Sequence, residues 1–276
     1  MNKNLILCAL IALLCLSCSK KDEPSQQQVT FKVSNFTSTT EPMGAPAPRK
    51  APASLVDGDV TLTDLILFDG DQYLLRQQST DPNFGTITVM LTVGEHDLHF
   101  IATASTDIAL NNGILTCASL KPTFGKTVHL NVNGASDENI TLDRLTGKLI
   151  ITINDAIPTG ASQLRIQLGD RYTSLDCATL FGVSPAAFDS PVNISGKVGN
   201  TGYNVNLYML APDADGYETS FTLTATNTSS QVIGQATGTI TIAPNTKTLL
   251  SGNLFTGTRS FISLNSAWNA EIEENF

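Results

Sequence analysis

The sequence is poor in charge, and the cations that it has are not clustered. Charged residues make up 15% of the chain, the formal net charge is −9, and no segment is rich in Lys and Arg. Nucleic-acid binding requires grouped cations that neutralise phosphates, so this composition argues against that function. The apolar run Leu5 to Leu16 has twelve residues, well below the roughly 20 that a membrane-spanning helix needs.

The chain also lacks the motifs that usually carry chemistry. It contains no G-x-S-x-G, no H-E-x-x-H and no glycine-rich phosphate loop, and its one C-x-x-C, Cys15-Leu16-Ser17-Cys18, lies at the end of the apolar run. Of its three histidines, His96 and His99 have an odd spacing, which on a strand directs them to opposite faces. Asp213 and Asp215 begin like a calcium loop but no Glu closes it, so a turn is the simpler interpretation. We therefore expect no enzyme activity, no metal and no cofactor.

The N-terminus has the order of an export signal. A basic start and a short apolar centre are followed by a small residue, Ser17, as in a signal peptide of residues 1–17. Leu16-Ser17-Cys18 resembles a bacterial lipobox, in which the cysteine is acylated and becomes the new N-terminus. We expect lipid on Cys18 and a polar tether over residues 18–27, the alternative being an ordinary secretory signal.

Only two cysteines remain if the signal is removed and Cys18 is lipidated. They are Cys117 and Cys177. An exported protein could oxidise them to each other. Because they fall in different expected domains, we favour two free, buried thiols, and pairing stays open.

Alternation of apolar and polar residues predicts an all-β protein. Val29, Phe31 and Val33 share one face of a first half-buried strand. A linker with four prolines follows at residues 38–54, and then "DVTLTDLILFDGDQYLLRQ", with Val60, Leu62, Ile66 and Phe68 expected to point inward. Further alternating segments and turn signals indicate β-sandwiches.

An internal similarity suggests two such sandwiches in tandem. At an offset of 121, "HFIATAST" (99–106) aligns with "SFTLTATN" (220–227), and Lys126-Thr127 aligns with Lys247-Thr248. We expect an N-terminal domain over residues 28–140 and a C-terminal domain over residues 141–276.

A glycan-binding module is an alternative of another class. Such modules need exposed aromatic rings, whereas the chain has one Trp and five Tyr, and most of its twelve Phe occupy inward positions. The aromatic residues are therefore assigned mainly to the cores.

Several ordered segments together resemble the fimbrillin family of type V pili of Bacteroidetes, including anchor and tip subunits. These are the lipobox, the first strand, the Pro-rich basic linker, "DVTLTDLILFDGDQYLL", "VGEHDLHFIATAST", "LDRLTGKLIITI" and "FISLNSAWNAEIEENF". The resemblance implies two transthyretin-like Greek-key sandwiches, export as an outer-membrane lipoprotein, adhesion through other fimbrial subunits or a receptor, and assembly by donor-strand exchange.

The same resemblance gives roles to both ends of the chain. Arg49 lies in a linker open to a trypsin-like protease, and a cut there would free the first strand with Val29, Phe31 and Val33. One parity of the C-terminal segment is apolar, as a groove-filling strand requires: Ile262, Leu264, Trp268, Ala270 and Ile272. The alternative is that Arg49 is an ordinary linker residue and that this segment is the protein's own last strand.

Overall fold

The computed structural model describes residues 25–34, 56–57, 60–256 and 261–267. In these ranges the chain forms β-strands and one short 3-10 helix, η1 (Ser195–Lys197). Within them no helix has the length and apolar character that crossing a bilayer requires. The expected sites Cys18, Arg49, Trp268, Ala270 and Ile272 lie outside the described residues.

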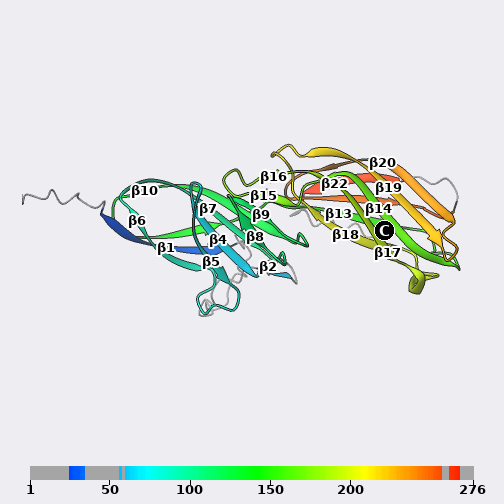
Figure 1. The fold of residues 1–276 in the computed structure, drawn as a ribbon, viewed down its shortest axis with the longest axis horizontal. Coiled ribbons are helices and arrows are strands. Elements are labelled where there is room, and N and C mark those ends of the chain that lie inside the picture. The colour runs from blue at the N-terminus through cyan, green and yellow to red at the C-terminus, as the bar shows by residue number, and fades with distance from the viewer. Residues whose placement is uncertain (1–24, 35–55, 58–59, 257–260, 268–276) are drawn as a thin grey trace, which may run out of the picture.

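Two β-sandwiches lie end to end along the long axis of the molecule (Figure 1). In the N-terminal sandwich a three-stranded sheet faces a five-stranded sheet. The first has the order β11 (Ser136–Thr141), β1 (Gln26–Ser34), β6 (Thr86–Thr92). The second has the order β12 (Asp143–Arg144), β10 (Thr123–Val132), β7 (Gly94–Thr103), β4 (Asp64–Asp69), β5 (Gln72–Gln78). A short pair, β2 (Val56–Asp57) and β3 (Val60–Thr61), stands apart.

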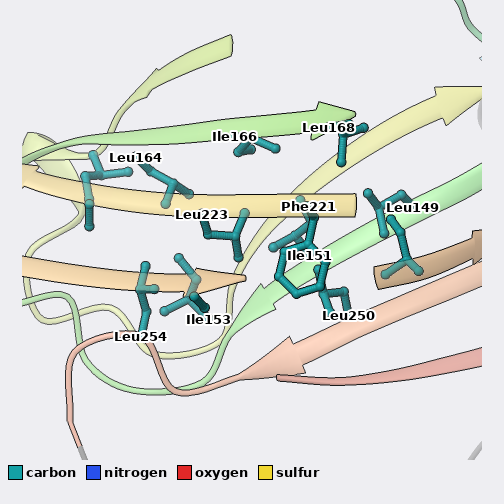
Figure 2. Packing of buried hydrophobic residues seen from close by; sticks show 14 of the residues in the cluster. Leu149, Ile151, Ile153, Leu164, Ile166, Leu168, Phe221, Leu223, Leu250 and Leu254 are labelled. Carbon is teal, nitrogen blue, oxygen red and sulfur yellow. The ribbon is translucent and has the colours of Figure 1, made fainter. Parts of the chain in front are cut away.

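The C-terminal sandwich consists of two four-stranded sheets. One has the order β18 (Tyr203–Met209), β13 (Gly147–Ile153), β21 (Thr246–Gly252), β22 (Phe261–Ala267). The other has the order β17 (Ala186–Asn193), β14 (Ala161–Arg171), β19 (Tyr217–Asn227), β20 (Val232–Ile242). Figure 2 shows the core between them, where Leu149, Ile151 and Leu250 face Ile166, Phe221 and Leu223. The alternation of the sequence produces this core, because every second residue of β13 is buried.

The two sandwiches share one order of strands. In each, the first strand runs parallel to a late strand and antiparallel to a middle one: β1 with β11 and β6, and β13 with β21 and β18. Likewise β5-β4-β7-β10 in one opposing sheet corresponds to β17-β14-β19-β20 in the other. The strand β22 has no counterpart among the described residues of the N-terminal sandwich.

This correspondence corrects half of the internal alignment. The segments at 99–106 and 220–227 belong to β7 and β19, which are equivalent strands. Lys126-Thr127, however, lies in β10, and Lys247-Thr248 lies in β21. These strands are not equivalent, because β10 belongs to the sheet opposite the first strand β1, whereas β21 belongs to the same sheet as the first strand β13. The second match was wrong, because short alternating strands resemble one another whatever their place in a sandwich.

A small third core joins the sandwiches. A four-stranded junction sheet combines the hairpin β8 (Ala109–Asn111) and β9 (Ile114–Thr116) with β15 (Ser174–Asp176) and β16 (Gly182–Val183). Leu115 of β9 pairs with Leu175 of β15. We call the buried residues around them the junction cluster: Ile66, Phe68, Ile101, Leu115, Leu120, Leu175, Cys177 and Leu210.

The junction cluster explains why β4 departs from the expected pattern. Leu65 and Leu67 face the N-terminal core, whereas Ile66 and Phe68 face the junction cluster. The strand is therefore buried on both faces. Ile66 and Phe68 point inward as expected, but into the junction cluster and not into the core that holds Leu62. The turn expected at Asp69-Gly70-Asp71 is present, with Asp69 paired to Gln72 and Gly70 at φ 54°.

Candidate functional site: the first strand and the C-terminal edge strand

The first strand occupies the centre of its sheet. Strand β1 pairs in parallel with β11 from Val29 to Ser34, and antiparallel with β6 from Gln26 to Lys32. It starts at Gln26, so the last two residues of the expected polar tether belong to the strand. Both backbone edges of β1 are thus satisfied by neighbouring strands, and its removal would leave two unpaired edges side by side.

The apolar face of β1 fills the middle of the N-terminal core. Val29 and Phe31 are fully buried, and Val33 is nearly so. The ring of Phe31 meets that of Phe100 edge to face, with 5.0 Å between centroids. Ile87, Leu91 and Ile140 belong to the same cluster. Without β1 this side of the core would be an apolar groove, bounded by the exposed ladder groups of β6 and β11.

The C-terminal segment forms the chain's own edge strand as far as the structure describes it. Strand β22 pairs antiparallel with β21, from Phe261 opposite Gly252 to Ala267 opposite Thr246. Ile262 and Leu264 share a face, as expected, but this face is solvent-exposed, at 67% and 62%. Over residues 261–267 the segment is therefore the protein's own last described strand, in agreement with the alternative interpretation.

One aromatic contact anchors β22 in the core. Phe261, the first residue of the strand, packs against the C-terminal cluster and meets Phe221 edge to face at 6.4 Å between centroids. The sequence interpretation missed Phe261, because it followed the longer apolar series of the opposite parity. A bulky aromatic residue at the start of the segment was the available signal.

A carboxylate holds the chain just before β22. Asp155, in the loop after β13, accepts hydrogen bonds from the backbone N–H groups of Leu254, Phe255 and Thr256 at 3.0, 2.7 and 2.7 Å, and from the Thr256 hydroxyl at 3.1 Å. Burial opposes its ionisation, but these bonds outweigh burial and lower the pKa of Asp155 below its usual value. Sequence patterns do not reveal this contact, since the partners are about a hundred residues apart.

Both thiols lie at the junction between the two sandwiches rather than in separate domains. Cys177 belongs to the junction cluster and Cys117 packs against it, and both are free. On the β9–β15 ladder Cys177 lies opposite Gly113, and Cys117 lies opposite Thr173. This offset separates the thiols by about 13 Å along the strands, too far for a disulfide. Burial raises the pKa of Cys177 to about 12 and also raises that of Cys117.

The histidines have ordinary structural contacts. The His96 ring bonds Asp69 at 2.6 Å and the Thr92 carbonyl at 2.8 Å, while His99 bonds the Thr127 hydroxyl at 2.9 Å. His129 contacts Asp97 on the surface. No group of His, Cys, Asp and Glu within the described ranges could hold a metal ion. Asp213 accepts from the N–H groups of Asp215 and Gly216, which makes the expected turn.

The described surface offers little aromatic area to a sugar. Tyr73, at 47%, is the only aromatic side chain in these ranges that is exposed. The other tyrosines are half-buried, for example Tyr172 and Tyr217, whose rings meet edge to face at 4.9 Å. A platform of several coplanar rings is not present in the part of the chain that the structure describes.

The arrangement defines a class: a tandem β-sandwich protein whose first strand is central and whose last described strand is an edge. Comparison with solved structures finds the same fold in proteins of Bacteroides and Porphyromonas. A candidate cell adhesion protein from Bacteroides ovatus superposes with a TM-score of 0.52 at 7% identity, over 90% of this chain and 99% of that one. A candidate polysaccharide-binding protein from Bacteroides thetaiotaomicron gives 0.51 at 12% identity, over 88% and 96%.

The fimbrial anchor protein Mfa2 from Porphyromonas gingivalis also matches, with a TM-score of 0.51 at 8% identity, over 88% of this chain and 98% of that one. These neighbours confirm the resemblance to fimbrillin-like proteins at the level of the fold. No family model and no curated protein matches the chain by sequence.

Proposed function

We propose that this chain is a structural protein of bacterial surface fimbriae, exported as a lipoprotein and held at the outer membrane through Cys18. Its two sandwiches would be the transthyretin-like Greek-key domains of a fimbrial subunit, without catalytic activity. Its partners would be other fimbrial subunits and, through them, an adhesion receptor. The fold shared with a fimbrial anchor protein and a candidate adhesion protein supports this function.

The observation that carries the proposal is the central place of β1. The strand precedes the stretch with Arg49, and its side chains Val29, Phe31 and Val33 fill the core. A cut after Arg49 would leave β1 held by non-covalent contacts alone. An extended segment from another chain could then replace it, satisfying the edges of β6 and β11 and filling the groove. This is assembly by donor-strand exchange.

The test compares Arg49→Ala with Lys50→Ala in cells that assemble the fimbriae. We expect the wild type and Lys50→Ala to be cut after residue 49, which N-terminal sequencing of polymer-derived protein would detect. Arg49→Ala should accumulate as an uncut precursor that does not polymerise. Normal polymers built from uncut Arg49→Ala would contradict donor-strand exchange at this strand.

A second candidate function is a membrane-retained anchor or accessory subunit. It is favoured by β22, which occupies its own sheet and inserts Phe261 into its own core. An anchor would keep both β1 and the lipid, so protein recovered with fimbriae should begin at acylated Cys18. Cys18→Ala should then shed intact fimbriae into the medium, and recovery of chains that begin at Lys50 would contradict the anchor function.

A further inference from the structure

In each sandwich the first strand of one sheet lies beside a late strand of the same sheet and runs parallel to it. Strands β1 and β11 are aligned over six residue pairs, from Val29 opposite Ser136 to Ser34 opposite Thr141. Strands β13 and β21 are likewise aligned over six pairs, from Lys148 opposite Lys247 to Ile153 opposite Gly252. The chain therefore enters each parallel pair at one end of the sandwich and leaves the pair at the other end.

Both pairs run along the long axis of the molecule. Strand β1 begins at the outer end of the N-terminal sandwich (Figure 1). Strand β13 begins at the junction, because its first residue Gly147 pairs with Met209, the neighbour of Leu210 in the junction cluster. Strand β21 runs in the same direction and ends at Gly252, away from the junction. Tension between the start of β1 and the end of β21 is thus directed along both parallel pairs.

Parallel pairs resist such tension in a particular way. The force tends to slide one strand along the other, so the hydrogen bonds between them, which lie across the strands, are loaded together. In an antiparallel hairpin that is pulled open from its free end, only the terminal residue pair carries the load. Each hydrogen bond contributes a net stability of only about 1 kcal/mol, so the bonds break one after another at low force. Sliding β1 would also drag Val29, Phe31 and Val33 out of close-packed surroundings.

We propose that the chain with its own first strand in place is a tension-bearing link, in which β1–β11 and β13–β21 act as two shear clamps in series. The clamps hold force applied between the N-terminus and the far end of the C-terminal sandwich. The property belongs to the fold itself, so it can be tested on the purified protein whatever the outcome of the proposed function.

Strand β22 behaves differently under the same tension. It is antiparallel to β21, and its last residue Ala267 lies opposite Thr246, at the junction end. Force applied beyond Ala267 opens the ladder one pair at a time toward Phe261. Asp155 binds residues 254–256 ahead of β22, so the load then passes to the end of β21. A short extension at low force therefore precedes opening of the clamps.

The experiment is single-molecule force spectroscopy on the chain without residues 1–17, pulled in two directions. In the first, handles are attached at the two termini. In the second, azide-bearing residues replace Glu218 and Thr241, two exposed positions that face each other across the antiparallel β19–β20 ladder. We expect end-to-end pulling to give a small low-force step and then two high-force steps, each lengthening the chain by roughly 35 nm.

Pulling through positions 218 and 241 should open the C-terminal sandwich at a force several-fold lower, although the protein and its stability are the same. Equal forces in both directions would overturn the proposal. A low force in the end-to-end direction would overturn it as well, because the parallel pairs would then bear no load.

Matched variants of β1 test the clamp itself. The Val33 N–H donates to Gly85 O on the β6 side, so the N–H of Lys32, its neighbour on the strand, points toward β11. Lys32→Pro removes that donor, whereas Lys32→Ala keeps it and loses only an exposed side chain with its solvent-exposed ion pair to Asp137, a contact that contributes little. Lys32→Pro should lower one high-force step and leave the other unchanged, and Lys32→Ala should change neither. If Lys32→Pro does not fold by circular dichroism, the two pulling directions still decide the question.

Discussion

At the scale of single residues, Phe31 is one of the largest fully buried side chains of the N-terminal core. It is fully buried in the central strand and packs edge to face on Phe100. Its burial matches the alternation in the sequence, which placed Val29, Phe31 and Val33 on the inward face. The two strands that pair with β1, β6 and β11, could not be predicted, because strand pairing depends on residues far apart in the chain.

Phe31→Ala should lower the free energy of unfolding of the N-terminal sandwich by about 3 to 5 kcal/mol, since it removes a large buried side chain and leaves a cavity. Chemical denaturation followed by fluorescence or circular dichroism measures the loss. Lys32→Ala, exposed on the same strand, is the control and should change stability by less than about 0.5 kcal/mol. A similar, small effect of both substitutions would mean that β1 contributes little to the folded core.

Asp155 predicts a pH dependence at the acid end. Its pKa in the folded protein is lowered, so the stability that it contributes is complete above the unfolded pKa of about 3.9 and is lost as the pH falls through the folded value. Asp155→Asn should therefore be less stable than the wild type at pH 7, and the difference should shrink as the pH falls from about 5 to about 2. Thermal unfolding across this range measures it. A constant difference would contradict the role of the charge.

At the scale of elements, long strands were predictable and short ones were not. The alternation in "GKLIITI" predicts a strand, and this segment is β13, in which every second residue is buried. Strands of the junction sheet, such as β9 and β15 with three residues each, are too short for a period to be seen. The partner of β22 could not be predicted either. An extended apolar segment can pair with the edge of its own sheet or fill a groove in another subunit, and the sequence pattern is the same in both cases.

The weak attachment of β22 leads to a prediction about local opening. Phe261 is its only core contact among the described side chains of the strand, whereas Ile262 and Leu264 face solvent. Phe261→Ala should therefore accelerate amide hydrogen exchange across Phe261–Ala267, with little change in β13. Ile262→Ala is the matched control and should leave exchange unchanged. Equal exchange in both variants would show that the ladder to β21, and not the aromatic contact, holds the strand.

At the scale of the whole molecule, the junction cluster joins the two sandwiches. The similarity of residues 99–106 and 220–227 indicated a second sandwich, but no pattern in the sequence indicated the junction. For that reason one buried face was expected for β4, whereas both of its faces are buried. Ile66 and Phe68 serve this third core. A sequence read one strand at a time does not reveal that a neighbouring sandwich covers the outer face.

Leu175→Ala should loosen the molecule at its middle. Leu175 is buried opposite Leu115 where the two sandwiches pair, and truncating a buried Leu costs about 2 to 5 kcal/mol. This loss falls on a small cluster, so small-angle X-ray scattering should show a broader distribution of interatomic distances than in the wild type. Leu110→Ala, at a more exposed position of the same sheet, should scatter like the wild type. Identical scattering from all three proteins would mean that other contacts fix the junction.

The parallel pairing of the first strand with a late strand also has a consequence for the order of folding. Strand β1 gains its partner β11, and β13 gains β21, only after about a hundred further residues have been made, and closing such long loops is entropically costly and slow. Neither sheet can be completed from its N-terminal portion. Until the late strand arrives, the strand that carries Phe31 has a partner on the β6 side only, and its other edge can associate with other chains. Each sandwich therefore folds late and as one unit, once its late parallel strand has been delivered.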